Sequence, residues 1–203
     1  MHPYQILRRG KPLQEAEKAL ILLHGRGSTA QNIITLADEF CDERFHVAAP
    51  HAGNNTWYPY SFLMPEAQNE PWLSSAVATV KRLIDEIAAV ISTQSIYIMG
   101  FSQGACLSLE VASRYATRYA GVAAFTGGLI GAQVNPEKYG GDFAGTPVFI
   151  GTSDVDPHVP VQRAEQSRDI IQGLGADVSL KIYPGMPHTI VPDEIGTVRK
   201  LMF

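Results

Sequence analysis

The sequence predicts an α/β protein with a mostly parallel central sheet flanked by helices, and two observations carry this prediction. Short apolar runs that match buried strands alternate along the whole chain with longer stretches that match helices. Each apolar run is bounded by Gly, Pro or Asn, and its length suits a strand better than a helix. Since no repeat, low-complexity tract or linker interrupts the alternation, we expect residues 1–203 to form one compact domain.

The apolar runs read as buried strands of a parallel sheet. The runs are residues 19–23 (ALILL), 45–49 (FHVAA), 96–99 (IYIM), 122–125 (VAAF), 148–150 (VFI) and 178–183 (VSLKIY). In parallel sheets of this kind the reactive groups lie at the carboxyl ends of the strands. The residues that directly follow each run are therefore the ones to search for chemistry.

Helical periodicity lies between the runs. Within residues 74–91, Val77, Val80, Ile84 and Ile87 recur at three- and four-residue spacing, which is one apolar face of a helix. Further helices are predicted over residues 30–40, 103–115, 160–173 and 192–202.

Composition excludes several classes of protein. Sixteen Lys and Arg against twenty Asp and Glu give a net charge of −4, and no basic run exists to bind nucleic acid. No stretch approaches the roughly 18 apolar residues of a membrane span, and residues 1–10 lack the apolar core of a signal peptide. Cys41 and Cys106 are too few for a disulfide framework and are expected to be buried apolar residues. We therefore expect a cytoplasmic protein without integral membrane association.

A candidate nucleophile follows the predicted strand at residues 96–99. Residues 100–104 read Gly-Phe-Ser-Gln-Gly, and a predicted helix begins directly after Ser102. A Gly-x-Ser-x-Gly between a strand and a helix is typical of a nucleophile elbow, a sharp turn that lifts the serine oxygen above the sheet. The motif alone also allows a glycine-rich turn with an inert serine.

A serine needs a base to take its proton, and in this fold the chain order is serine, acid, histidine. His188 lies in Pro-Gly-Met-Pro-His beyond the last predicted strand, so it is the expected base. The acid should follow the run at residues 148–150, where both Asp154 and Asp156 occur. Spacing leaves the choice open, because Asp154 could instead form a turn.

The oxyanion of an acyl-transfer reaction needs two N–H donors. One is expected from the backbone of Gln103, the residue after the nucleophile. The other is expected from the backbone of Arg26, because Leu-His-Gly-Arg-Gly at residues 23–27 follows an early strand and its glycines allow the amides to turn inward. A plain glycine turn is the alternative.

Six segments together resemble the phospholipase/carboxylesterase family, the bacterial relatives of acyl-protein thioesterases. They read LLHGRGS, APHAG, GFSQGA, FTGGL, DVDPHVP and YPGMPH, and the resemblance runs over about residues 20–188. It implies a compact α/β-hydrolase fold without a large lid, a metal or a cofactor. His24 and His51 fall on loop positions that read as structural rather than catalytic.

The resemblance also implies roles for particular residues. The family's nucleophile falls on Ser102 and its base on His188. Its acid is the aspartate directly before a proline, which falls on Asp156. Its oxyanion donors fall on the backbone N–H groups of Arg26 and Gln103.

The family's substrate specificity cannot be carried over to this chain as directly, because two features of the sequence depart from the family pattern. Arg26 stands where many relatives have an apolar residue, and residues 54–71 replace a segment that builds much of the relatives' substrate groove. We expect the Arg26 side chain to point to solvent, with pairing to an anionic substrate as the alternative. The expected substrate pocket consists of Trp57, Tyr58, Phe62, Leu63, Met64, Leu129 and Ile130.

The expected function is hydrolysis of small carboxylic esters with short or medium acyl or aryl groups, with lysophospholipids and thioesters left open. Dienelactone hydrolases share the fold but use a cysteine nucleophile, and Ser102 argues against them. A catalytically silent protein that binds a small ligand is the alternative from another class. Exposed apolar residues near a lidless site could also form a homodimer surface.

Overall fold

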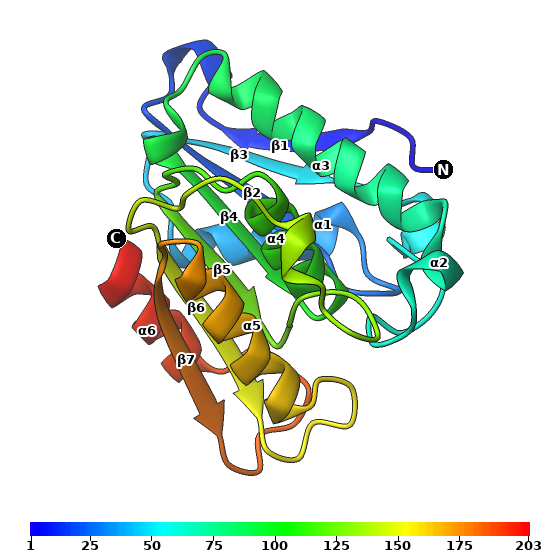
Figure 1. Ribbon diagram of the computed structural model, residues 1–203. Coiled ribbons are helices and arrows are strands. Elements are labelled where there is room, and N and C mark those ends of the chain that lie inside the picture. The colour runs from blue at the N-terminus through cyan, green and yellow to red at the C-terminus, as the bar shows by residue number, and fades with distance from the viewer.

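A seven-stranded sheet forms the centre of the computed structural model, which describes residues 1–203 (Figure 1). The strands are β1 (Ile6–Gly10), β2 (Lys18–Leu23), β3 (Phe45–Pro50), β4 (Ile96–Phe101), β5 (Gly121–Phe125), β6 (Pro147–Ser153) and β7 (Asp177–Tyr183). Their spatial order is β1-β3-β2-β4-β5-β6-β7, and only β1 runs antiparallel to its neighbour. The predicted mostly parallel sheet is confirmed.

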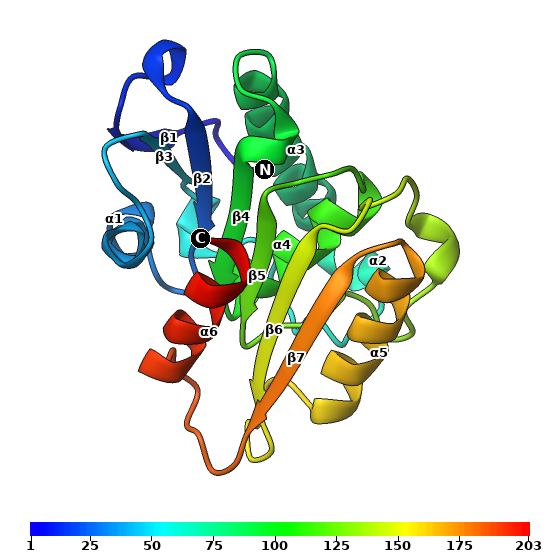
Figure 2. The ribbon, with the colours of Figure 1, turned by 90° about the vertical axis from the view of Figure 1, so that its left-hand side faces the viewer.

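Helices cover both faces of the sheet. They are α1 (Ala30–Ile33), α2 (Glu66–Asn69), α3 (Trp72–Ala88), α4 (Gln103–Arg114), α5 (Val161–Gly173) and α6 (Pro192–Met202). Short 3-10 helices span Leu13–Glu15, Ile34–Glu39, Gly53–Asn55, Thr93–Ser95 and Pro136–Lys138. Figure 2 shows α1 and α6 on one face and α3, α4 and α5 on the other.

The inner strands are apolar on both sides because each side faces a separate core. Along β2, Leu20 and Leu22 pack into the core under α1 and α6, whereas Ile21 and Leu23 pack into the core under α3, α4 and α5. All four side chains are fully buried. This two-sided burial explains why the sequence shows continuous apolar runs rather than alternation.

Besides the short helix α2 and the 3-10 helices, which were not predicted, two elements differ from the sequence prediction. β1 was not predicted, because only Ile6 and Leu7 of this edge strand are apolar and its remaining residues are exposed. The predicted helix over residues 30–40 is one turn of α-helix, which the Thr29 side chain caps, followed by a 3-10 helix. The β-branched residues Ile33, Ile34 and Thr35 disfavour a continuous α-helix at this point.

None of the helices combines the length and the apolar character that crossing a bilayer requires. The parallel strands place their carboxyl ends at one edge of the sheet. The loops after β2, β4, β6 and β7 therefore meet there, and these loops carry the candidate catalytic residues and oxyanion donors.

Candidate active site

Ser102 occupies a sharp turn between β4 and α4. Its φ of 55° and ψ of −117° lie in a region that costs a non-glycine residue free energy. A Cβ at Gly104 would collide with the carbonyl oxygen of Leu23, and a Cβ at Gly100 would collide with the backbone of Gly104. The two glycines of the motif are therefore required by close backbone packing, and the strained turn presents the serine hydroxyl at the end of the sheet.

His188 joins Ser102 to Asp156. Its Nε2 lies 2.8 Å from Ser102 Oγ, and its Nδ1 lies 2.6 Å from Asp156 Oδ2. A carboxylate only accepts, so Nδ1 carries the proton and donates it to Asp156. Nε2 then has a free lone pair and accepts a hydrogen bond from the serine hydroxyl. This tautomer is the one that a general base beside a serine needs.

Asp156 is held in its ionised form. Burial by itself would raise the pKa of this carboxyl, but the hydrogen bonds from His188 and from the backbone N–H groups of His158 and Val159 outweigh it and lower the pKa. Those two amides lie 2.7 and 3.0 Å from Oδ1. The carboxylate therefore keeps its charge and can stabilise a protonated His188.

The other aspartate, Asp154, has a different contact. Its Oδ1 accepts a hydrogen bond of 2.7 Å from the backbone N–H of Gly185, at the start of the loop that carries His188. At the other end of that loop, Glu194 Oε2 accepts from the backbone N–H of Val191 at 3.0 Å. Asp154 and Glu194 thus fix the two ends of the loop, and of the two candidate acids only Asp156 reaches His188.

Glu194 makes folding stability depend on pH. Its side chain is fully buried, and burial raises its pKa to about 7. Because this folded pKa lies above the ordinary value of 4.5, the stability tied to the group is full below about pH 4.5 and is lost as the pH rises through 7. A shift of this size corresponds to about 3 kcal/mol.

We therefore expect Glu194→Gln to unfold at a higher urea concentration than the native protein at pH 8.5, with little difference near pH 4.5. Glutamine keeps the acceptor for Val191 but cannot ionise. Urea unfolding at both pH values measures this. If the unfolding midpoints of the native protein and the variant changed equally between the two pH values, the raised pKa of Glu194 would be contradicted.

The two expected oxyanion donors have no partner within the protein. The backbone N–H groups of Arg26 and Gln103 donate to no protein acceptor, whereas the adjacent amides of Gly27 and Ser28 donate to the carbonyls of Asn55 and Gly25. The unpaired amides lie on the loops after β2 and β4, on the same side of the sheet as Ser102. They are free to receive a developing negative charge.

His24, which the sequence suggests is structural, lies beside this loop. The ring is fully buried, and burial lowers its pKa. Its Nε2 accepts from the backbone N–H of Ala52 at 3.1 Å, so Nδ1 carries the proton and donates to the Gly25 carbonyl at 2.8 Å. A neutral imidazole therefore ties the loop after β2 to the loop after β3.

A cavity of about 690 Å³ opens at Ser102 and His188. This volume suits a small-molecule ligand. Of the seven residues expected to form the pocket, three line the cavity, namely Tyr58, Phe62 and Leu63. The other lining residues are Gly25, Arg26, Ser28, Pro59, Tyr60, Ser61, Phe101, Ser102, Gln103, Cys106, Pro157, His158, Val159 and His188.

The other four expected pocket residues, Trp57, Met64, Leu129 and Ile130, do not line the cavity. Trp57 is fully buried behind it and donates its indole N–H to the carbonyl of His24. Leu129 and Ile130 are fully buried in the core. Met64 is exposed at the surface. Aromatic and aliphatic residues near a strand end thus divide between cavity wall and core, and composition alone does not separate them.

The Gln103 side chain positions the cavity wall, a role that the sequence analysis missed. Its Oε1 accepts from the backbone N–H of Trp57 at 2.9 Å, and its Nε2 donates to the carbonyl of Tyr58 at 2.8 Å. Both bonds are buried, and they fasten the loop after β3 to the first turn of α4. No sequence signal identifies this pairing, because the partners are backbone groups 46 and 45 residues away.

We expect Gln103→Met to raise KM several-fold and to cost roughly 1–3 kcal/mol of stability, because two buried backbone groups lose their partners. The kcat should change less, since the backbone N–H of residue 103 is retained. The exposed Gln68, whose side chain makes no recorded hydrogen bond, provides the control Gln68→Met. Ester kinetics and urea unfolding measure both effects, and equal behaviour of the two variants would contradict the positioning role.

The Arg26 side chain does not simply point to solvent as expected. Its Nη1 donates to the carbonyl of Pro59 at 2.7 Å, and its Nη2 donates to the carbonyl of Tyr60 at 2.6 Å. The guanidinium carbon lies 6.0 Å from the centre of the Tyr58 ring. Arg26 therefore braces the same loop from the outer side while its charge stays at the edge of the cavity.

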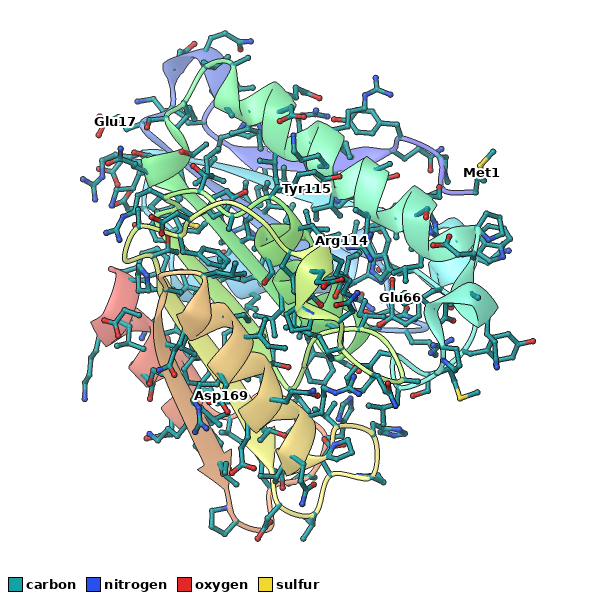
Figure 3. All side chains as sticks on the ribbon, in the orientation of Figure 1. Met1, Glu17, Glu66, Arg114, Tyr115 and Asp169 are labelled. Carbon is teal, nitrogen blue, oxygen red and sulfur yellow. The ribbon has the colours of Figure 1, made fainter.

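A buried ionic cluster holds the loop that follows β5. Glu110 of α4 is fully buried and accepts from the backbone N–H of Ile130 at 3.0 Å, while Arg114 and Lys138 pair with its carboxylate. Figure 3 shows Arg114 beside Glu66 of α2, and the two side chains pair at 2.9 Å. The cluster thus connects α2, α4 and this loop.

Cys106 lies one helical turn beyond Ser102 and also lines the cavity. Its side chain is buried, and burial raises the pKa of the thiol to about 12. The thiol is protonated at neutral pH, and a protonated thiol is a poor nucleophile. Cys106 is therefore no competing nucleophile at neutral pH, and the elbow position itself holds Ser102.

Comparisons with known proteins agree with the geometry. A model of the phospholipase/carboxylesterase family matches residues 10–202. Acyl-protein thioesterase 1 of Saccharomyces cerevisiae is 27% identical over an alignment 214 residues long, which covers 93% of each chain. A SOBER1-like probable carboxylesterase of Arabidopsis thaliana is 30% identical over 129 residues, which cover 63% of this chain and 49% of that protein.

Solved structures give the same result. A phospholipase/carboxylesterase from Dyadobacter fermentans, known from its crystal structure, is 50% identical in sequence to this chain. The two structures match with a TM-score of 0.97 over 99% of this chain and 97% of that one. Esterase PE8, at 24% identity and a TM-score of 0.76 over 96% of this chain and 95% of its own, shares the fold. The resemblance seen in the sequence is confirmed: the chain has the α/β-hydrolase fold and belongs to the phospholipase/carboxylesterase family.

Proposed function

We propose that the protein is a serine hydrolase that cleaves small carboxylic esters through an acyl-enzyme on Ser102. The observation that carries this proposal is the continuous hydrogen-bonded line from Ser102 Oγ through His188 to Asp156, which opens into a cavity of about 690 Å³. Serine, base and acid in this order provide a nucleophile, a proton acceptor and a charged group that orients the base.

In the first half of the reaction, His188 takes the Ser102 proton as Oγ attacks the ester carbonyl. The bond between Oγ and the carbonyl carbon forms, and the carbonyl oxygen becomes an oxyanion. As the tetrahedral intermediate collapses, the carbonyl re-forms and the bond to the leaving group breaks. His188 donates the proton that it took from Ser102 to the alkoxide oxygen of this leaving group. Asp156 stays ionised and stabilises the imidazolium in between.

In the second half, water takes the place of the alcohol. His188 removes a proton from the water as its oxygen attacks the acyl carbon, and the bond to Ser102 Oγ then breaks with return of that proton to Oγ. The backbone N–H groups of Arg26 and Gln103 are proposed to bind the oxyanion in both halves, because neither has a partner in the resting protein. One such donor typically contributes about 3–4 kcal/mol.

The substrates that fit best are soluble esters with short or medium acyl groups. Tyr58, Phe62 and Leu63 supply an apolar wall, but the cavity is also lined by Ser28, Gln103 and other polar groups. The same chemistry would also cleave a thioester, whose leaving group needs less protonation. Since both cysteines have free thiols, we expect the protein to act in the cytoplasm.

Hydrolysis of p-nitrophenyl esters from acetate to palmitate tests this proposal, with Ser102→Ala measured beside the native protein. We expect a maximum in kcat/KM at short or medium acyl chains that disappears in the variant. Turnover that is flat along the series and equal in the variant would contradict an acyl-enzyme on Ser102. It would bring a ligand-binding role forward instead.

A further inference from the structure

The charge of the cavity is unusual for a chain with a net charge of −4. None of the residues that line the cavity is an aspartate or a glutamate, whereas Arg26, His158 and His188 are all among them. Asp156 lies behind His188, where its carboxylate receives three hydrogen bonds. The surface that a substrate contacts therefore carries positive charge without a neutralising carboxylate.

Arg26 is the permanent charge at this surface. It forms no salt bridge, and its recorded side-chain hydrogen bonds go to two neutral backbone carbonyls, those of Pro59 and Tyr60. A guanidinium has five N–H donors in a planar fork, so Nε–H and one N–H on each of Nη1 and Nη2 stay available. The two carbonyl contacts hold the fork in place, which lowers the entropy lost when it binds a ligand.

His158 adds a second polar group at the opposite side of the opening. Its ring lies edge-on to His188, with 5.0 Å between the ring centres, and its side chain is exposed and makes no recorded hydrogen bond. Arg26 follows β2 and His158 follows β6, so the two side chains approach the cavity from loops on either side of Ser102.

We propose that the cavity selects esters that carry a negative charge, a carboxylate in particular, and that the Arg26 guanidinium is the group that recognises this charge. This inference rests on the proposed esterase function and narrows its substrates. A charged hydrogen bond between guanidinium and carboxylate is roughly twice as strong as a neutral one, and a carboxylate can accept two of them from the fork. An acidic substrate would also be drawn toward the cavity from solution.

Matched ester pairs that differ by a methyl cap on a remote carboxylate test the proposal. In the first pair, p-nitrophenyl hydrogen adipate and p-nitrophenyl methyl adipate place the charge on the acyl side. In the second pair, p-acetoxybenzoate and its methyl ester place the charge on the leaving group. The readout is the ratio of kcat/KM within each pair, after subtraction of the rate with Ser102→Ala. This ratio cancels any loss that a variant causes for both esters.

We expect the native enzyme to prefer the charged ester in one of the pairs by about tenfold or more, and added salt to weaken that preference. Arg26→Gln should reduce the preference about tenfold, and Arg26→Lys should keep part of it. The control is Arg82→Gln. Arg82, on α3, also forms no salt bridge with a carboxylate, but its guanidinium lies over the Tyr4 ring and does not line the cavity. That variant should leave both ratios unchanged.

Two outcomes would overturn the proposal. One is a native enzyme that hydrolyses the capped esters as well as, or better than, the charged ones in both pairs. The other is an Arg26→Gln variant that loses equal activity toward both members of each pair, which would leave Arg26 as a loop brace alone. In both cases neutral esters would still be cleaved in a Ser102-dependent way, so the proposed function would stand. Failure of that function would instead appear as Ser102-independent rates.

Discussion

Ser102→Ala is expected to lower kcat for ester hydrolysis by about five to six orders of magnitude, the largest effect of any single change in the protein. The substitution removes the oxygen that attacks the carbonyl, so no acyl-enzyme can form. Stability should change little, because the hydroxyl contacts only His188 and alanine meets the same backbone strain at a φ of 55°. Stopped assays with p-nitrophenyl butyrate and urea unfolding measure the two quantities.

Ser74→Ala is the matched control, because Ser74 is an exposed serine on α3 that does not line the cavity. This variant should retain native turnover. A Ser102→Ala protein that folds normally and keeps more than about one hundredth of native kcat would contradict the mechanism, because that residual rate far exceeds what an oxyanion site without a nucleophile provides.

Asp156→Asn is expected to lower kcat by about four orders of magnitude, with Asp154→Asn close to native. An asparagine at residue 156 can turn its amide N–H₂ toward His188 Nδ1, which favours the proton on Nε2. That tautomer cannot accept the serine proton, and the stabilising charge is also lost. At residue 154, asparagine keeps an oxygen that can accept from Gly185, so the loop that carries His188 stays in place.

The two aspartate variants form a matched pair, since they make the same chemical change two residues apart. Their kcat values with one ester, measured at a pH where the native enzyme is fully active, decide the assignment. Equal losses in both variants would show that the acid does not act through His188, and a larger loss at residue 154 would exchange their roles.

The placement of Ser102 and His188 beside each other could be predicted from the sequence, because their positions follow from short-range features. Ser102 lies between an apolar run and an amphipathic helix, and its neighbouring glycines reflect a backbone contact that no side chain would allow. His188 follows the last strand of a parallel sheet, where reactive groups are found. Spacing could not separate Asp154 from Asp156. The structure separates them by contact, since one reaches Gly185 and the other reaches His188.

The cavity wall could not be predicted in the same way, because long-range bonds determine the path of residues 54–71. Gln103 fastens this segment from the inside, Arg26 braces it from the outside, and the buried Asn69 bonds back to Tyr60 and Ser61. Most of these bonds involve backbone groups, which leave no mark in the sequence. The pocket prediction therefore mixed wall residues with core residues.

The edge strand β1 was missed for a related reason. Its partner is β3, some 40 residues away in the sequence, and the strand exposes Arg8, Arg9 and Gly10 to solvent. A strand with little apolar character is stabilised by the backbone bonds of its neighbour rather than by its own side chains. Sequence pattern detects apolar side chains. It therefore found β7, the other edge strand, through Val178, Leu180 and Ile182, and it missed β1.

The central claim is that Ser102 is a nucleophile activated by His188, and covalent labelling tests it most directly. The native protein would be treated with a fluorophosphonate, digested and analysed by mass spectrometry, with His188→Ala treated in parallel. We predict that Ser102 Oγ alone attacks the phosphorus, so that an O–P bond forms there while the P–F bond breaks and the serine proton is lost with fluoride. Labelling of the variant should be slower by orders of magnitude. An unlabelled protein, or a label on any other residue, would contradict the account.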